Sequence, residues 1–191
     1  MSTVQHPRPT AVIVYESMFG NTRRIAEAIA SGMGDRVDAT IVSAADAPPR
    51  VSCDVLVVGA PTHAHSLSRP SSRAEAGVWA RDHGKRLTLE AGAGATGVRE
   101  WLEGTPDARL GYAAFDTRVD MPKIFTGAAS SAIAKRLTKA GLNRLSPPES
   151  YLVDKDSHLL DGELERARAW GDALAAEVLS RRSPVTGEGQ R

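Results

Sequence analysis

Two short runs of apolar, mostly β-branched residues constrain the fold of this chain more than any other feature. Residues 11–15 read Ala-Val-Ile-Val-Tyr, and residues 54–59 read Asp-Val-Leu-Val-Val-Gly. Runs without an alternating polar face are typical of strands that are covered on both sides, and such strands occur in parallel sheets. A polar loop follows each run. The sequence therefore predicts an α/β fold built on an internal parallel sheet.

Weaker patterns place the remaining elements. Further strands are predicted at residues 37–43, 110–115 and 151–153, and helices at residues 25–33, 98–102, 126–141 and 161–178. Thr126 is the expected N-cap of the third helix. Residues 71–95 are mixed in charge and lack a clear period, so they give no prediction. Strands that alternate with helices indicate right-handed crossovers, and we expect a doubly wound, five-stranded parallel sheet in a three-layer α/β/α sandwich.

Length and composition favour a single domain. With 191 residues, 41% of them hydrophobic, the chain is long enough to bury one sizeable core. We expect this domain to span residues 10–182, with a flexible N-terminus over residues 1–9 and a disordered tail over residues 183–191.

Charge and cysteine usage limit the partners and the compartment. The 24 Lys and Arg residues nearly balance the 23 Asp and Glu residues, so the overall field predicts no nucleic-acid partner. No apolar stretch approaches the roughly 20 residues of a membrane span, so we expect no membrane association. The single cysteine, Cys53, lies where the second apolar run begins and suits a buried thiol in a reducing compartment. We therefore expect a cytoplasmic protein.

The loop after the first apolar run carries the strongest functional signal, because ligands of doubly wound sheets bind beyond the carboxyl ends of the strands. It reads Glu16-Ser17-Met18-Phe19-Gly20-Asn21-Thr22 and leads directly into the first helix. Its hydroxyl and amide side chains can hydrogen-bond a phosphate, Gly20 lets the backbone wrap closely, and the helix N-terminus presents free N–H groups. A Gly-Lys-Ser/Thr sequence is missing, which disfavours a P-loop and fits a monophosphate ester held by neutral donors. The alternative is an ordinary polar loop that Thr22 caps.

The segment from Tyr15 to Thr22 resembles the loop that binds the phosphate of flavin mononucleotide (FMN) in the flavodoxin family. Residues 59–63, Gly-Ala-Pro-Thr-His, are similar to the family's segment along one edge of the isoalloxazine ring, and residues 116–120 stand where its other flavin-contacting loop is found. The resemblance covers residues 10–179 and implies a flavodoxin-like fold with FMN as cofactor. It implies a site made of Ser17, Met18, Phe19, Gly20, Asn21, Thr22, Pro61, Thr62, His63, Asp116, Thr117 and Arg118.

The loops depart from the family in one respect. Flavodoxins usually stack an aromatic residue on the flavin, whereas these loops offer His63, His65 and Arg118. The departure favours flavodoxin-like relatives over the small electron carriers themselves. An Arg118 guanidinium beside the ring would stabilise the reduced, anionic flavin. The alternative is that Arg118 points to solvent or pairs with Asp116 or Asp120.

The resemblance implies an FMN flavoprotein that acts in electron transfer with a redox partner protein. The alternative is an FMN-dependent NAD(P)H:quinone-type oxidoreductase with a small-molecule electron acceptor, and a third is a binding module that has lost the cofactor. Basic residues cluster near the predicted site and favour an anionic partner: Arg118, Lys123, Lys135, Arg136, Lys139 and Arg144. This cluster does not separate a carrier from a reductase.

Several other motifs suggest ligand sites but also have purely structural interpretations. Residues 92–97 match the dinucleotide pattern G-x-G-x-x-G, with Asp116 as its ribose-binding acid, but residues 85–90 alternate with charge and the following helix is cut short. A flexible Gly/Ala loop near the flavin is the favoured interpretation. His63 and His65 have no acidic or thiol ligand nearby in sequence, so no metal is predicted. Cys53, Trp101 and Trp170 are predicted to be packing residues.

Overall fold

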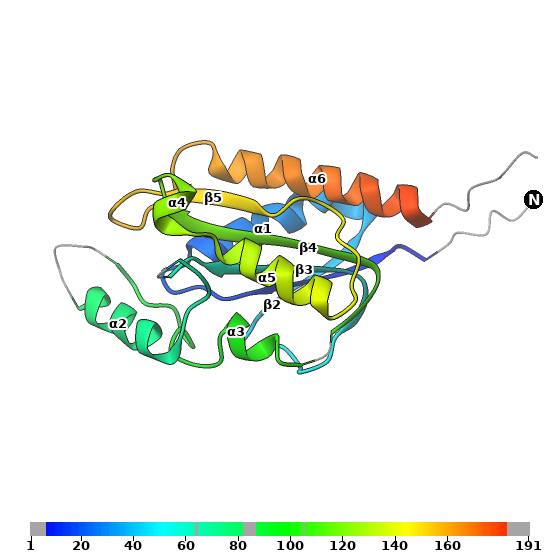
Figure 1. The fold of residues 1–191 in the computed structure, drawn as a ribbon. Coiled ribbons are helices and arrows are strands. Elements are labelled where there is room, and N and C mark those ends of the chain that lie inside the picture. Colours follow the sequence, from blue (N-terminus) through cyan, green and yellow to red (C-terminus); the bar gives the residue numbers. More distant parts are fainter. Residues whose placement is uncertain (1–6, 64, 82–86, 105, 183–191) are drawn as a thin grey trace, which may run out of the picture.

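A computed structural model describes residues 7–63, 65–81, 87–104 and 106–182, and its central feature is a parallel sheet (Figure 1). The strands are β1 (Thr10–Tyr15), β2 (Asp38–Ser43), β3 (Ser52–Pro61), β4 (Asp107–Val119) and β5 (Glu149–Val153). They pair in parallel in the order β2-β1-β3-β4-β5. This order confirms the predicted doubly wound, five-stranded sheet. The order in which successive strands are added to the sheet reverses between β1 and β3. Folds of this kind bind their ligands at this switch point.

Helices cover both faces of the sheet (Figure 1). The helices α1 (Asn21–Met33) and α6 (Glu163–Arg182) lie on one face, and α3 (Val98–Trp101) and α5 (Ala129–Lys139) lie on the other. Ile13, Val57 and Phe115 pack under the first pair, while Leu56 and Val58 pack under the second. The alternating side chains of β3 thus supply both cores, as expected for a strand covered on both sides. The three-layer α/β/α sandwich is confirmed.

The backbones of α1 and α6 touch. A Cβ atom on Gly171 of α6 would lie 2.1 Å from the carbonyl oxygen of Ile29, and one on Gly32 of α1 would lie 2.0 Å from the carbonyl oxygen of Arg168. Only glycine allows this approach at either position. The helix that begins at the end of the loop 17–22 is therefore fixed against α6 as well as against the sheet.

Two differences from the sequence predictions concern helices. Residues 71–80, part of the segment that gave no prediction, belong to α2 (Pro70–Ala80). Only Arg73 and Ala76 of this helix are buried, so it has no apolar stripe that the sequence could reveal. Thr126 is not the N-cap of α5: it ends a short helix, α4 (Lys123–Thr126), and α5 begins at Ala129. The cap of α5 comes from β4, because Oδ2 of Asp116 accepts the Ser130 N–H at 2.9 Å.

The predicted ends of the domain are described only in part. Residues 1–6 of the expected flexible N-terminus and all of the expected tail, 183–191, lie outside the described residues. Residues 7–9 are described, and the carbonyl of Pro9 accepts the Asp38 N–H of β2 at 2.8 Å. The segment just before β1 is therefore attached to the edge of the sheet.

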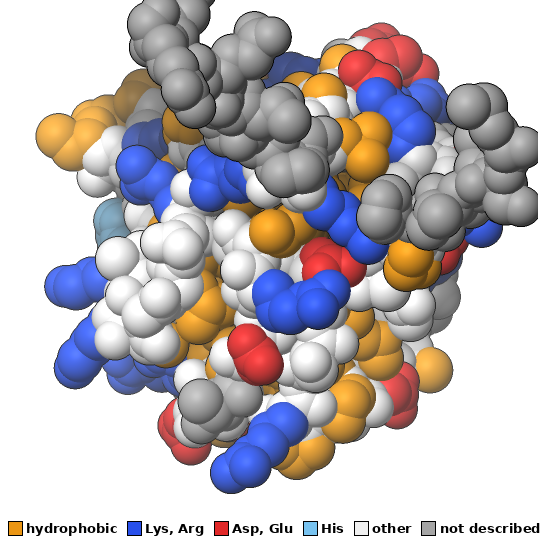
Figure 2. All heavy atoms as spheres, turned by 90° about the vertical axis from the view of Figure 1, so that its right-hand side faces the viewer, with side chains coloured by type: hydrophobic (Ala, Val, Ile, Leu, Met, Phe, Trp, Pro, Cys, Tyr) orange, Lys and Arg blue, Asp and Glu red, His pale blue; other side chains and the backbone are white. Residues whose placement is uncertain are grey.

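The end of the sheet at which the strands begin faces the viewer in Figure 2. Basic, acidic and hydrophobic side chains are interspersed over the part of that face left uncovered by grey atoms. Among the helices that the structure describes, none combines the length and the apolar character needed to cross a membrane.

Candidate functional site

The loops that follow β1, β3 and β4 meet around a cavity of about 220 Å³. Its walls contain every residue of the predicted site except Gly20 and Asp116. They also contain four residues that the sequence did not single out: Trp79, Val119, Val153 and Ser157. Segments far apart in the chain therefore converge at the switch point of the sheet, as the resemblance implied.

The loop 17–22 presents a ring of polar hydrogens at the N-terminus of α1. Gly20 precedes the helix with φ of 86°, a conformation that other residues rarely adopt. The Ser17 hydroxyl accepts the Gly20 N–H at 3.0 Å, which leaves its own hydrogen to be donated elsewhere. In the described part of the chain, the amides of Met18, Phe19, Asn21 and Thr22 find no acceptor. Such a ring, at the positive end of a helix, is suited to an anion.

The arginine that follows this loop in the sequence is already paired with carboxylates. Arg23 pairs with Glu90 at 2.5 Å and with Glu27 at 2.7 Å. Glu90 also donates its N–H to the carbonyl of Met18 at 2.8 Å, so residue 90 lies over the loop. An anion bound to the loop would consequently be held by neutral donors, as the sequence predicts.

Asn21 and Thr22 connect this loop with its neighbours. The Asn21 side chain donates one amide hydrogen to the carbonyl of Ser157 at 2.5 Å, and the hydroxyls of Thr22 and Thr117 are 2.8 Å apart. Part of the hydrogen-bonding capacity that the sequence assigned to a ligand is thus used to join the loop to the ends of β4 and β5. These bonds shape one wall of the cavity.

The loop after β3 is locked to the start of α5. The Thr62 N–H bonds the Thr117 carbonyl at 2.8 Å, and the Thr62 hydroxyl accepts the Ala129 N–H at 2.9 Å. Gly127 lets the backbones meet, since a Cβ there would lie 2.1 Å from the carbonyl oxygen of His65. Burial lowers the pKa of His63, so its imidazole is neutral at neutral pH.

Arg118 lines the cavity and is tied to the backbone beside it. Its Nη1 donates to the carbonyl of Val119 at 3.2 Å and to the carbonyl of Met121. Among the described residues it forms no ion pair with Asp116 or Asp120, so the alternative pairing is not found. The described walls hold this one guanidinium and no carboxylate. The electrostatics of the cavity therefore favour an anionic ligand.

Asp116 is a correction to the predicted site. Its side chain is fully buried between β4 and α5, where Oδ2 accepts the Ser130 N–H, and it does not line the cavity. Burial raises the pKa of this carboxyl, while the bond from Ser130 opposes the rise. The alternation of side chains along β4 turns residue 116 away from the face that Thr117 presents. The Asp116 side chain thus caps α5 and does not reach the cavity.

Replacing Asp116 by Asn should stabilise the protein at neutral pH and have less effect in acid. Burial raises the pKa of the Asp116 carboxyl, so the folded protein binds its proton more tightly than the unfolded chain does. The wild type therefore loses stability as the pH rises from the pKa of the unfolded chain to that of the folded protein. Asn keeps the acceptor for Ser130 and does not titrate, and the nearby hydroxyls of Ser130 and Ser150 can accept its N–H groups. Urea unfolding from about pH 4 upward measures the difference. A variant less stable than wild type at neutral pH would contradict this assignment.

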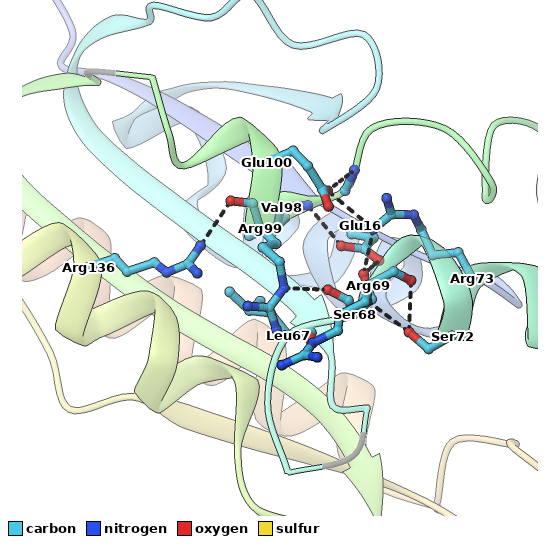
Figure 3. Close-up of polar contacts among 11 residues, drawn as sticks. Glu16, Leu67, Ser68, Arg69, Ser72, Arg73, Val98, Arg99, Glu100 and Arg136 are labelled. Carbon is cyan, nitrogen blue, oxygen red and sulfur yellow. Dashed lines mark hydrogen bonds and ion pairs between the residues drawn. The ribbon is translucent and has the colours of Figure 1, made fainter.

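A buried polar network supports the loops from behind (Figure 3). Glu16, 6% exposed, accepts the hydroxyl of Ser68 and the N–H of Val98, the latter at 2.8 Å. Arg73, 5% exposed, donates to Ser68 at 3.0 Å and pairs with Glu100 at 3.2 Å. The network joins the ends of β1 and the loop after β3 to α2 and α3. The sequence carries no sign of this network, because a polar residue after a strand is typical of a solvated loop.

Two aromatic side chains lie on the described walls of the cavity, and the sequence pointed to one of them. Phe19 comes from the loop after β1, and Trp79, 41% exposed, comes from α2. Phe19 packs with Met18, Ala76 and Ala93, which places α2 against the loop. One aromatic side chain therefore reaches the cavity from the loop after β1, and another from a helix without a recognisable sequence period.

The dinucleotide interpretation of residues 92–97 lacks its structural context. Residues 87–90 before it form no strand, and α3 after it has 4 residues. Gly92, Ala93 and Thr96 line a cavity of about 180 Å³ beside Tyr15 and Ser43, and Ser17 lines both this cavity and the candidate site. A dinucleotide fingerprint needs a strand before the loop and a full helix after it.

The remaining candidate residues pack in the interior. Cys53 is 4% exposed, and burial raises the pKa of its thiol to about 11, so it is a protonated thiol at neutral pH. Trp101 is buried and donates to the carbonyl of Pro48 at 3.0 Å, and Trp170 packs edge-on against Phe115. Within the described ranges, no group of three His, Cys, Asp or Glu side chains could hold a metal ion.

Comparison with known proteins agrees with this architecture. No protein-family model matches the sequence, and a search of curated proteins gives no match either. A flavodoxin from the domain Archaea aligns with a TM-score of 0.58 at 20% identity, over 89% of this chain and 99% of that chain. A WrbA-like flavodoxin from Agrobacterium tumefaciens aligns with a TM-score of 0.51 at 17% identity, over 91% of this chain and 99% of that one.

Larger proteins contain the same architecture as one part. The rubredoxin oxygen:oxidoreductase of Desulfovibrio gigas aligns with a TM-score of 0.58 at 15% identity, over 91% of this chain and 37% of that protein. This chain thus spans about a third of that relative's length. Together with the strand order and the position of the cavity, these similarities establish that the chain has the flavodoxin-like fold, as the resemblance implied.

Proposed function

We propose that this protein binds FMN in the cavity between the loops after β1, β3 and β4 and acts in electron transfer as a flavodoxin-like flavoprotein. The observation that carries the proposal is the loop 17–22. Its unmatched amides and the free hydrogen of Ser17 stand at the N-terminus of α1, on a cavity whose described walls contain no carboxylate. This donor set fits a terminal phosphate.

The rest of the cavity suits the ring system. Pro61, Thr62 and His63 would follow one edge of the isoalloxazine, and Thr117 and Arg118 its other side, with Phe19 and Trp79 as apolar surfaces. The volume of about 220 Å³ is below the roughly 300–1,000 Å³ of most ligand pockets, so part of the flavin would stay exposed to a partner. The bound flavin would supply one- and two-electron chemistry, and the protein would set its potential through Arg118.

Weakening the loop should weaken FMN binding. We expect Ser17→Ala and Thr22→Ala each to cost about 1–3 kcal/mol of FMN affinity through lost charge-assisted hydrogen bonds. Thr40→Ala, at an exposed position of β2, serves as the matched control and should bind like wild type. Fluorescence titration with FMN, alongside thermal unfolding, measures affinity and fold separately. Wild-type affinity in both loop variants would disprove the assignment of the loop.

Two forms of this function differ in the redox partner of the flavin. The first is a carrier that passes electrons to a redox partner protein. The alternative is an FMN-dependent NAD(P)H:quinone-type oxidoreductase, which the arginines near His63 favour because its donor is anionic. Anaerobic stopped-flow reduction of the FMN-loaded protein separates them: rapid reduction by a nicotinamide cofactor supports the enzyme, and none supports the carrier. We place either activity in the cytoplasm, where the buried thiol of Cys53 would stay reduced.

A further inference from the structure

A second cavity, of about 440 Å³, adjoins the one described above. His63 lines both cavities. The remaining walls of the second cavity come from the loop after His63, the first turn of α2 and the start of α3, and they include Ser66, Arg69, Ser72 and Arg99. A molecule bound there would lie beside a flavin in the first cavity.

Two arginines in this second cavity have no carboxylate partner among the described residues. The exposed Arg69 guanidinium forms no hydrogen bond or ion pair with any residue that the structure describes. Arg99 is held by neutral groups, since its Nε donates to the Ser68 carbonyl at 2.7 Å and its Nη2 donates to the Leu67 carbonyl. Figure 3 shows the two side chains next to each other. Arg99 is thus a positioned guanidinium that forms no ion pair with a described residue.

These cations are close enough to repel one another. Burial, Arg136 and Arg69 lower the pKa of Arg99, and Glu100 and Glu16 oppose that shift. Arg136 also donates to the carbonyl of Arg99 at 2.9 Å. Glu75 is the one carboxylate on the described walls of the cavity, and it is not paired with either arginine. Holding like charges together is unfavourable unless an anion lies between them. The hydroxyls of Ser66 and Ser71 add donors to the same wall.

Resting on the proposed FMN function, we propose that the second cavity binds a phosphate group of the flavin's small-molecule electron donor, and that Arg69 and Arg99 thereby select NADPH over NADH. The two donors differ by one phosphomonoester on the adenosine ribose. Arginine forks match phosphate oxygens in a way that a single ammonium does not. In the reaction, NADPH would transfer one hydride, a proton with two electrons, to the FMN, so that NADPH becomes NADP⁺ and the FMN becomes the anionic reduced flavin.

The site is tested first without FMN, on the full chain. Calorimetry should show adenosine 2′,5′-bisphosphate binding at least about tenfold more tightly than 5′-AMP, which lacks the second phosphate. Arg69→Gln and Arg99→Gln should remove most of that difference. Arg168→Gln, in a surface pair with Glu165 on α6, makes the same change of charge elsewhere and should leave it intact. Because Arg99 also holds two carbonyls, Arg69→Gln decides the matter if the Arg99 variant does not fold.

Four results would overturn the inference. The first three are no binding of the bisphosphate, equal binding of both nucleotides, and an unchanged preference in Arg69→Gln. A fourth is competition by inorganic phosphate as effective as by the bisphosphate, which would make this a site for free phosphate. In the FMN-loaded protein, the kcat/KM for NADPH should exceed that for NADH by about tenfold and fall to near equality in Arg69→Gln, with unchanged FMN affinity. Failure to bind FMN would overturn the proposed function while leaving the nucleotide measurement readable.

Discussion

FMN should bind this protein at least about 100-fold more tightly than riboflavin, a difference of about 3 kcal/mol. The two ligands share the isoalloxazine and the ribityl chain, so the whole difference reports on the phosphate. Each hydrogen bond to a charged group contributes about 1.5–3 kcal/mol, and the loop 17–22 offers several unmatched donors at the positive end of α1. The donors stand ready before the ligand arrives, since Gly20 and Ser17 already fix the loop.

FAD should bind more weakly than FMN, because its phosphate continues into a second nucleotide. The loop has little room for that extension, since Asn21 is bonded to Ser157 and residue 90 lies over the carbonyl of Met18. Titrations with riboflavin, FMN and FAD under the same conditions measure both differences. Equal affinities for riboflavin and FMN would show that the loop does not bind the phosphate, whatever else occupies the cavity.

Glu16→Ala should lower the free energy of unfolding by about 2–4 kcal/mol. The substitution removes the acceptor of two buried hydrogen bonds, one from Ser68 and one from Val98. Ser68 also accepts a hydrogen bond from the buried guanidinium of Arg73, so the substitution disturbs the hydroxyl to which that guanidinium is bonded. The wild-type network is closely packed, since a Cβ on Gly97 would lie 2.6 Å from both Arg73 and Glu16.

Glu165→Ala is the matched control for this variant. Its carboxylate is 72% exposed and pairs with Arg168 on the surface of α6, where ion pairs contribute little. Urea unfolding of both variants, followed by circular dichroism, compares a buried and an exposed glutamate on the same scale. If Glu16→Ala unfolded at the same urea concentration as Glu165→Ala, the network would be incidental to the fold.

The sequence predicted correctly those features that are built from consecutive residues. β1 and β3 were visible because both of their faces are buried, and the loop 17–22 was visible because consecutive residues build it. The predicted end of each strand then placed Thr62, His63 and Thr117 at one edge of the sheet. All of these follow from the period of a strand and the direction of parallel strands.

Features that depend on partners distant in sequence were not visible. The cap of α5 is Asp116, a residue of β4, so the nearby Thr126 was the wrong choice. Glu16 became a buried acceptor because Ser68 and Val98 meet it across the fold. Helix α2, and with it Trp79, gave no apolar period because few of its residues face the core. A single sequence carries no signal of these pairings, since each depends on the final packing.

The contact between α1 and α6 fixes when the site can be completed during synthesis. Helix α1 emerges from the ribosome early, whereas Gly171 and the apolar residues of α6 that cover Ile29 lie near the other end of the chain. Domains of this kind become stable only when such late contacts form. The loop 17–22 is anchored on the first turn of α1, so its nascent form lacks a fixed base until α6 has docked. Cofactor loading is therefore expected only after α6 has been synthesised, and a truncation that removes Gly171 and the residues after it should abolish loading although every residue of the proposed site is still present.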